Sequence, residues 1–203
     1  QVDVLINMGH TQDGLPAGAG DASAQTQYTI TVTNSGASSS YATNVQMLDF
    51  FPADGSTAAF AIVGGAVDSV ALKSGTNRFS TSDCKFVTTP KTGLQCDFDW
   101  LAPGESVDIK FTLEATAVTN GTIPVGTILH HASVSADAEA LSSSADVSKN
   151  NTVTDRTSAY VVGSGINPAD LRDLSIVKTV TSPTPGIQVK AGDQIEYLLT
   201  VKN

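Results

Sequence analysis

The class of fold is decided by one segment, Leu94-Gln95-Cys96-Asp97-Phe98-Asp99-Trp100-Leu101-Ala102-Pro103-Gly104-Glu105-Ser106-Val107-Asp108-Ile109-Lys110-Phe111-Thr112-Leu113-Glu114-Ala115. Apolar and polar residues alternate in it on both sides of an Ala-Pro-Gly sequence, which is typical of a turn. A period of two places one side of a β-strand in a core and the other side in water. The segment therefore predicts two adjacent strands, with inward faces formed by Leu94, Cys96, Phe98 and Trp100 and by Val107, Ile109, Phe111, Leu113 and Ala115.

The same alternation recurs elsewhere in the chain. Three apolar residues alternate with threonines at 28–32, and another such face runs from Ile128 through His130 to Ala136. Turn residues such as Asn34-Ser35-Gly36 and Asn120-Gly121 separate these runs, and no long helical period is present. These features predict an all-β fold, an Ig-like antiparallel β-sandwich. We interpret 60–78 and 137–151 as long loops.

Composition excludes several classes of protein. The 203 residues carry a net charge of −9, and the 11 Lys and Arg are scattered, so a nucleic-acid partner is not expected. No apolar run approaches the roughly 18 residues that cross a bilayer. Gln1 opens directly into Val-Asp-Val-Leu-Ile, which we interpret as a mature or trimmed N-terminus.

The two cysteines, Cys84 and Cys96, flank a turn marked by Pro90 and Gly93. Two extended arms that fold back here would bring the sulfurs together, so we predict a disulfide across a hairpin, which favours an oxidising compartment. The alternative is a pair of buried free thiols in a cytosolic protein. Two thiols fall short of the four ligands of a structural zinc site, so no metal is expected there.

An internal repeat links the two ends of the chain. Near the start lie Asp3-Val4-Leu5-Ile6, Ala19-Gly20-Asp21 and Tyr28-Thr29-Ile30-Thr31-Val32-Thr33-Asn34. Near the end lie Asp173-Leu174-Ser175-Ile176, Ala191-Gly192-Asp193 and Tyr197-Leu198-Leu199-Thr200-Val201-Lys202-Asn203. We therefore predict a sandwich over 1–162, a linker with a short helical turn over 163–172, and the first two strands of a second, incomplete Ig-like module over 173–203. Two strands cannot close a sandwich, so their apolar residues are candidate subunit contacts: Leu174, Ile176, Val180, Ile195, Tyr197, Leu199 and Val201.

These landmarks resemble one known family. The Leu-Ser-Ile-Val-Lys-Thr-Val opening at 174–180, the Ala-Gly-Asp and Tyr-x-Leu-Thr-Val-x-Asn sequences, and the segment 96–107 are similar to the conserved-repeat modules called domain of unknown function eleven. The resemblance implies Ig-like sandwiches in tandem in large secreted or envelope-attached prokaryotic proteins, and it implies no activity. The chain departs from the family where His131 replaces an Asn and where Met8 occupies the position that matches Lys178. Whether Lys178 snorkels its amine to water or forms an isopeptide bond stays open.

No catalytic motif is visible, so the chain is not expected to be an enzyme. His130 and His131 point to opposite faces of a strand and cannot converge on one metal or substrate. No cofactor is expected either, and Ca²⁺ remains an alternative, because carboxylates in loops could gather around it. Those residues are Asp13, Asp21, Asp54, Asp137, Asp146, Asn150 and Asn151, with Asp170 and Asp173 at the junction. With one Trp, placed in the core, no exposed aromatic platform for a carbohydrate is predicted.

The sequence thus predicts a non-enzymatic structural protein of the prokaryotic cell surface, in which tandem modules form an extracellular stalk or filament. Its expected partner is another copy of itself or a neighbouring repeat, and subunits could share strands. The alternative is a ligand-binding adhesin module that uses the segments 60–78 and 137–151 as its recognition surface.

Overall fold

The computed structural model describes residues 2–17, 22–51, 60–88, 92–116, 126–137, 151–161, 175–182, 194 and 196–202. It divides into two compact units, Gln1–Ser164 and Gly165–Asn203, which are described separately. The division falls within the linker predicted at 163–172.

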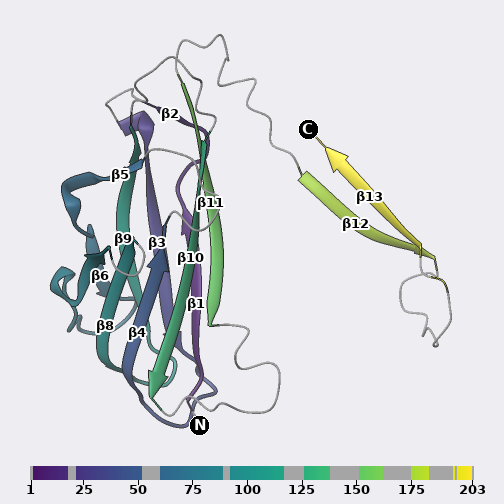
Figure 1. Ribbon diagram of the computed structural model, residues 1–203. Coiled ribbons are helices and arrows are strands. Elements are labelled where there is room, and N and C mark those ends of the chain that lie inside the picture. The colour runs from purple at the N-terminus through teal and green to yellow at the C-terminus, as the bar shows by residue number, and fades with distance from the viewer. Residues whose placement is uncertain are drawn as a thin grey trace. The chain divides into compact units, whose positions relative to one another are not determined.

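The first unit is built from two β-sheets, with strands running lengthwise in both (Figure 1). In the part of this unit that the structure describes, the pairings are antiparallel except that of β2 with β11, which is parallel. The prediction of an all-β sandwich is therefore confirmed. The first sheet has the order β1 (Val4–His10), β3 (Gln25–Asn34), β9 (Ser106–Ala115) and β5 (Phe60–Ile62), with β6 (Ser69–Leu72) also on β9. The second has the order β2 (Leu15–Ala17), β11 (Thr152–Val161), β10 (Gly126–Asp137), β4 (Ala42–Phe50), β8 (Gly93–Leu101) and β7 (Cys84–Val87). Short 3-10 turns lie at Ala22–Ala24, Val63–Gly65 and Thr81–Asp83.

The core lies between the two sheets, where the apolar faces predicted from the alternation meet. In β3 and β9 every second residue is buried, and Tyr28 lies opposite Phe111 while Ile30 lies opposite Ile109. The second sheet contributes Val45 and Met47 from β4 together with alternate residues of β8 and β10. Burial of each such side chain stabilises the fold by about 1.5 to 3 kcal/mol.

The turn between β8 and β9 is fixed by a glycine and an asparagine. Gly104 has φ of +78°, a left-handed conformation that an L side chain rarely adopts. Its N–H donates to the Asn34 carbonyl at 2.8 Å, and the Asn34 side chain, fully buried, donates to the Leu101 carbonyl at 2.9 Å. The last residue of β3 thus holds the Ala-Pro-Gly turn predicted from the sequence.

The predicted inward position of Trp100 is wrong, because its side chain is 38% exposed. The alternation of β8 holds from Leu94 to Phe98 and then breaks, since Asp99 and Trp100 are both exposed before Leu101 is buried again. The paired strand β4 breaks in the same place, around Asn44, which has φ of 50°. Both strands carry the same irregularity, so their register is unchanged while Trp100 turns outward.

The segment 60–78 is not the long loop expected from the sequence. It supplies β5 and β6, which both pair with β9 and so satisfy the backbone groups along its edge. The Asn77 side chain closes the segment by donating to the carbonyls of Val70 and Phe79 and accepting from the Leu72 N–H. Strands of three and four residues are too short to show an alternation. Of the loop predicted at 137–151, residues 138–150 lie outside the described residues.

Cys84 and Cys96 are joined by a disulfide, with their Cα atoms 4.0 Å apart. The two residues lie directly opposite each other in β7 and β8, so the bond crosses the predicted hairpin. It ties the edge strand of the second sheet covalently to its neighbour. Closing a loop of this size stabilises a fold by roughly 3 kcal/mol in the chain-entropy model.

Candidate functional site

The second unit presents apolar residues to solvent. It is a two-stranded antiparallel sheet of β12 (Ser175–Ser182) and β13 (Glu196–Lys202). Three of the predicted contact residues are exposed: Tyr197 by 48%, Leu199 by 58% and Val201 by 64%. Leu174 and Ile195, and the side chains of Ile176 and Val180, lie outside the described part of the chain. Val177 and Leu198 are also exposed, by 51% and 55%.

The hairpin repeats the pairing of β1 with β3. In the first unit Ile6 lies opposite Val32, Met8 opposite Ile30 and His10 opposite Tyr28. In the second unit the pairs at the positions matched by the sequence repeat are Ile176 with Val201, Lys178 with Leu199 and Val180 with Tyr197. The same residues of the repeat thus face one another in both units.

The two units differ in what covers that pairing. On β3, Tyr28, Ile30 and Val32 are fully buried, and the second edge of the strand is paired with β9. On β13 the matching residues are exposed, and among the strands that the structure describes β13 pairs with β12 alone. An unpaired edge next to exposed apolar side chains is a template for strand addition. This edge and face of β13, Glu196–Lys202, form the candidate assembly site.

Lys178 lies on the exposed hairpin. Its Nζ is 3.9 Å from the centroid of the Tyr197 ring, a cation–π contact. The contact keeps the aliphatic stem of the lysine on the face that carries Tyr197 and Leu199. Whether Lys178 forms an isopeptide bond stays open.

A buried hydrogen bond between Asp49 and His130 in the first unit was not predicted from the sequence. Asp49 Oδ2 lies 2.8 Å from His130 Nδ1, and both side chains are fully buried. The Tyr28 ring packs at 4.1 Å from the imidazole centroid, and its hydroxyl is hydrogen-bonded to Thr157. As predicted, His130 points inward while His131 is exposed. The pair lies between the sheets and is removed from solvent, so its role is to fix the core.

A second histidine, His10, joins β1 to β11 at the margin of the core. Its Nδ1 lies 2.7 Å from Asp155 and its Nε2 lies 3.1 Å from Asp13. Burial alone lowers the pKa of His10, but the hydrogen bonds to Asp155 and Asp13 outweigh burial and raise the pKa above 6.5. Asp13, one of the predicted calcium ligands, is engaged in this contact.

A pH dependence of stability follows from His10. Because its pKa is higher in the folded state, the stabilisation is complete below pH 6.5 and is lost as the pH rises through the folded pKa. We expect His10→Gln to lower the free energy of unfolding at pH 5.5 and to matter less at about pH 8.5. Urea unfolding at both pH values measures the difference. The exposed His131→Gln variant serves as the control and should change neither value.

Arg78 lies on the surface of the first unit, where it contacts the Glu105 carboxylate, the Trp100 carbonyl and the Trp100 ring. It donates from Nη1 and Nη2 to the carboxylate of Glu105, at 2.7 and 2.5 Å, and from Nη2 to the Trp100 carbonyl at 2.7 Å. Its guanidinium carbon lies 3.6 Å from the centroid of the Trp100 ring. The hydrogen bond from Arg78 lowers the pKa of Glu105, against a smaller opposing effect of burial.

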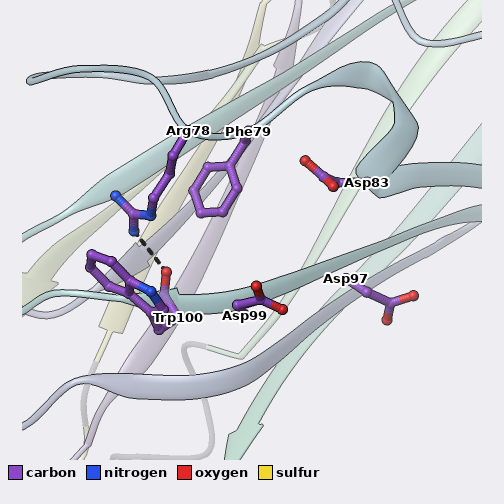
Figure 2. A pocket seen from close by; sticks show the side chains of 6 residues that line it. All are labelled: Arg78, Phe79, Asp83, Asp97, Asp99 and Trp100. Carbon is purple, nitrogen blue, oxygen red and sulfur yellow. Dashed lines mark hydrogen bonds between the residues drawn. The ribbon is translucent and has the colours of Figure 1, made fainter.

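This arrangement borders an acidic cleft of about 210 Å³ (Figure 2). Tyr41, which is 59% exposed, packs against Trp100 in a T-shaped contact with the two ring centroids 5.3 Å apart. The two rings together form an exposed aromatic surface beside the cleft. The expectation of no exposed aromatic cluster is therefore wrong, because Trp100 turns outward beside Tyr41. The cleft is lined by Arg78, Phe79, Asp83, Asp97, Asp99 and Trp100.

No group of three or more His, Cys, Asp or Glu side chains that could hold a metal ion occurs in the described part of the chain. Of the predicted calcium ligands, Asp137 is hydrogen-bonded to Asn44, and the amide of Asn151 donates to the Val134 carbonyl at 3.3 Å. Asp21, Asp54, Asp146, Asn150, Asp170 and Asp173 lie outside the described residues. Calcium binding stays an untested alternative to the expectation of no cofactor. Among the described residues, no helix is long and apolar enough to cross a membrane.

Comparison with known proteins gives a likeness of fold alone. No family model matches the sequence, and no curated protein matches it. The collagen-binding subdomain of the Enterococcus faecalis surface protein ACE is 9% identical with a TM-score of 0.39, over 77% of this chain and 95% of that one. The full-length major pilin SpaD of Corynebacterium diphtheriae is 13% identical with a TM-score of 0.44, over 90% of this chain and 38% of the pilin. AvmM, which catalyses macrocyclization in alchivemycin A biosynthesis, is 10% identical with a TM-score of 0.37, over 81% and 91% of the two chains.

Proposed function

We propose that this chain is a non-enzymatic structural protein of the prokaryotic cell surface. In this proposal Ig-like modules follow one another to form an extracellular stalk or filament, and the hairpin of β12 and β13 is the start of a module that is completed by further strands. Sandwich modules joined end to end give a polymer length and stiffness without any turnover.

One observation carries the proposal: β12 and β13 repeat the pairing of β1 and β3, yet leave exposed the residues that β3 buries. Three exposed apolar side chains on β13, Tyr197, Leu199 and Val201, are each worth about 1.5 to 3 kcal/mol on burial, which favours covering that face with another strand and sheet. The Cys84–Cys96 disulfide supports the extracellular location, because such bonds persist in oxidising compartments.

Removal of the second unit tests the proposal. A chain that ends at Ser164 is expected to stay folded and monomeric, since the first unit has its own core. The full chain is expected to associate as its concentration rises, because the exposed hairpin remains. Sedimentation velocity measures association, and near-ultraviolet circular dichroism checks the fold of both chains. Equal behaviour of the two folded chains in sedimentation would refute an assembly role for the hairpin.

A second candidate function, a ligand-binding adhesin module, is favoured by the exposed Trp100 beside the acidic cleft. The recognition surface would then be this cleft, which takes only Arg78 from the segment 60–78. A partner rich in Lys would complement the three carboxylates that line it. Since Trp100 is the single Trp of the chain, its fluorescence reports on the cleft directly. Titration with oligolysine should change that emission, and Asp99→Asn should weaken the change; an unchanged emission argues against this function.

A further inference from the structure

We propose that the open edge of β13 pairs with the same edge of a second copy of this chain, as an antiparallel two-fold pair centred on Leu199. The inference rests on the assembly role proposed for the hairpin, and it names the partner and the register. The result is a continuous four-stranded sheet with the order β12, β13, β13 and β12.

The geometry follows from two-fold symmetry. When identical antiparallel strands are related by a two-fold axis, one residue lies opposite itself and its neighbours pair reciprocally. With Leu199 at the centre, Tyr197 lies opposite Val201 of the partner and Leu198 lies opposite Thr200 of the partner. Glu196 lies opposite Lys202 of the partner, and this pair occurs twice because of the symmetry.

Charge selects this centre. Glu196 and Lys202 are the charged side chains of β13, one at each end of the strand. Directly opposite unlike charges stabilise an antiparallel pair, and like charges destabilise it. A centre on Leu198 would put Glu196 opposite Thr200, and a centre on Thr200 would put Lys202 opposite Leu198. Only the centre on Leu199 therefore pairs both charges of both strands.

The same register aligns the apolar faces. Directly opposite residues in an antiparallel pair point to one face of the sheet, so Tyr197, Leu199 and Val201 of both copies share a face. This matches the first unit, where β9 places Phe111, Ile109 and Val107 opposite the matching residues of β3. The β13 strand of the second copy thus takes the place beside β13 that β9 takes beside β3.

The second copy offers β13 and not β9 as the pairing strand. Its β9 is already paired with β3 on one edge and with β5 and β6 on the other, so it cannot be added elsewhere without opening the first sheet. Its β13 has an open edge and the complementary charges. Both partners can therefore pair without rearrangement of their own units.

Charge reversal tests the register in the full 203-residue chain. Glu196→Lys and Lys202→Glu each turn two attractive pairs into two repulsive pairs, so each should weaken association at least about tenfold. The double variant restores opposite charges across the axis and should bind within about threefold of the original chain. Lys85→Glu makes the same change of net charge as Lys202→Glu at an exposed position of β7 and should leave association unchanged.

Cysteine cross-linking tests the centre independently. Leu199→Cys places two thiols directly opposite each other, as Cys84 and Cys96 are in β7 and β8. The chain has no free cysteine, so the added thiol is the single reactive one. Under mild oxidation Leu199→Cys should form a covalent dimer with itself, whereas Leu198→Cys should form one only when mixed with Thr200→Cys.

The outcomes separate this inference from the proposed function. Association that requires residues 165–203 but ignores the charge variants, or a Leu199→Cys variant that does not cross-link, overturns the two-fold register and leaves the assembly role standing. Weaker association of both single charge variants, with association restored in the double variant, supports the register. A full chain that stays monomeric at all concentrations, with slow hydrogen exchange along β13, overturns the choice of a second copy as the partner.

Discussion

Replacement of Asp49 by alanine is expected to lower the free energy of unfolding of the first unit by about 1 to 3 kcal/mol, because it leaves the buried His130 side chain without its hydrogen-bond partner. Asp49 and His130 are both fully buried and 2.8 Å apart. Removal of the carboxylate leaves the imidazole between Tyr28 and Phe51 without its polar partner. Urea unfolding followed by the fluorescence of Trp100 measures the loss.

Two control variants make the cause specific. Asp99→Ala removes an exposed carboxylate from the neighbouring strand β8 and should change the free energy of unfolding by less than about 0.5 kcal/mol. Replacing both buried partners by apolar residues, Asp49→Leu with His130→Phe, removes the unpaired polar group and should cost less than Asp49→Ala alone. A double variant that is less stable than Asp49→Ala would contradict the interpretation.

Replacement of Gly93 by alanine is expected to lower the free energy of unfolding by about 2 to 3 kcal/mol through overpacking. A Cβ atom at this position would lie 2.3 Å from the carbonyl oxygen of Asp49 and 3.1 Å from Cδ1 of Phe50. The first contact is with backbone, which cannot rotate away. Strand β4 would have to move away from β8 at Asp49, the residue that is hydrogen-bonded to the buried His130.

The matched control is Gly9 in β1, where a Cβ atom would meet no heavy atom within 4 Å. Gly9→Ala should leave the free energy of unfolding unchanged or raise it by up to about 1 kcal/mol, because alanine restricts the unfolded chain. Thermal unfolding monitored by circular dichroism compares the two variants under one condition. Similar midpoints for both variants would show that the space around Gly93 is larger than the structure indicates.

Alternation predicted the long strands well because each of them buries one face. Strands β3, β9 and β10 cover the predicted segments. The inward residues predicted in these three strands, from Tyr28 to Val32, from Val107 to Ala115 and from Ile128 to Val134, are buried. The repeat predicted the second hairpin for a related reason: the same residues pair in the same register in both units. These features depend on local pattern, which a single sequence carries.

Other features depend on neighbours across the sheets and could not be predicted. Trp100 is turned outward by an irregularity that β8 shares with β4 at Asn44. The alternation of apolar and polar residues in β8 does not indicate this irregularity. The hydrogen bond of Asp49 with His130 joins residues 81 positions apart. The signal in the sequence was Asp49 itself, a carboxylate two residues after Met47 on an inward strand face. Without a known partner it could not be interpreted. The short strands β5 and β6 are defined by the open edge of β9 and not by their own sequence.

The direction of the end strands decides how the first unit responds to tension. The chain enters along β1 and leaves along β11, and both strands run from the same end of the sandwich to the other (Figure 1). A pull between these two points acts along the strands, so the hydrogen bonds of β1 with β3 and of β11 with β10 are loaded in shear. Seven residue pairs in the first ladder and eight in the second would have to slip together instead of opening one after another. In the proposed row of modules, force along the row would therefore load these two ladders in shear.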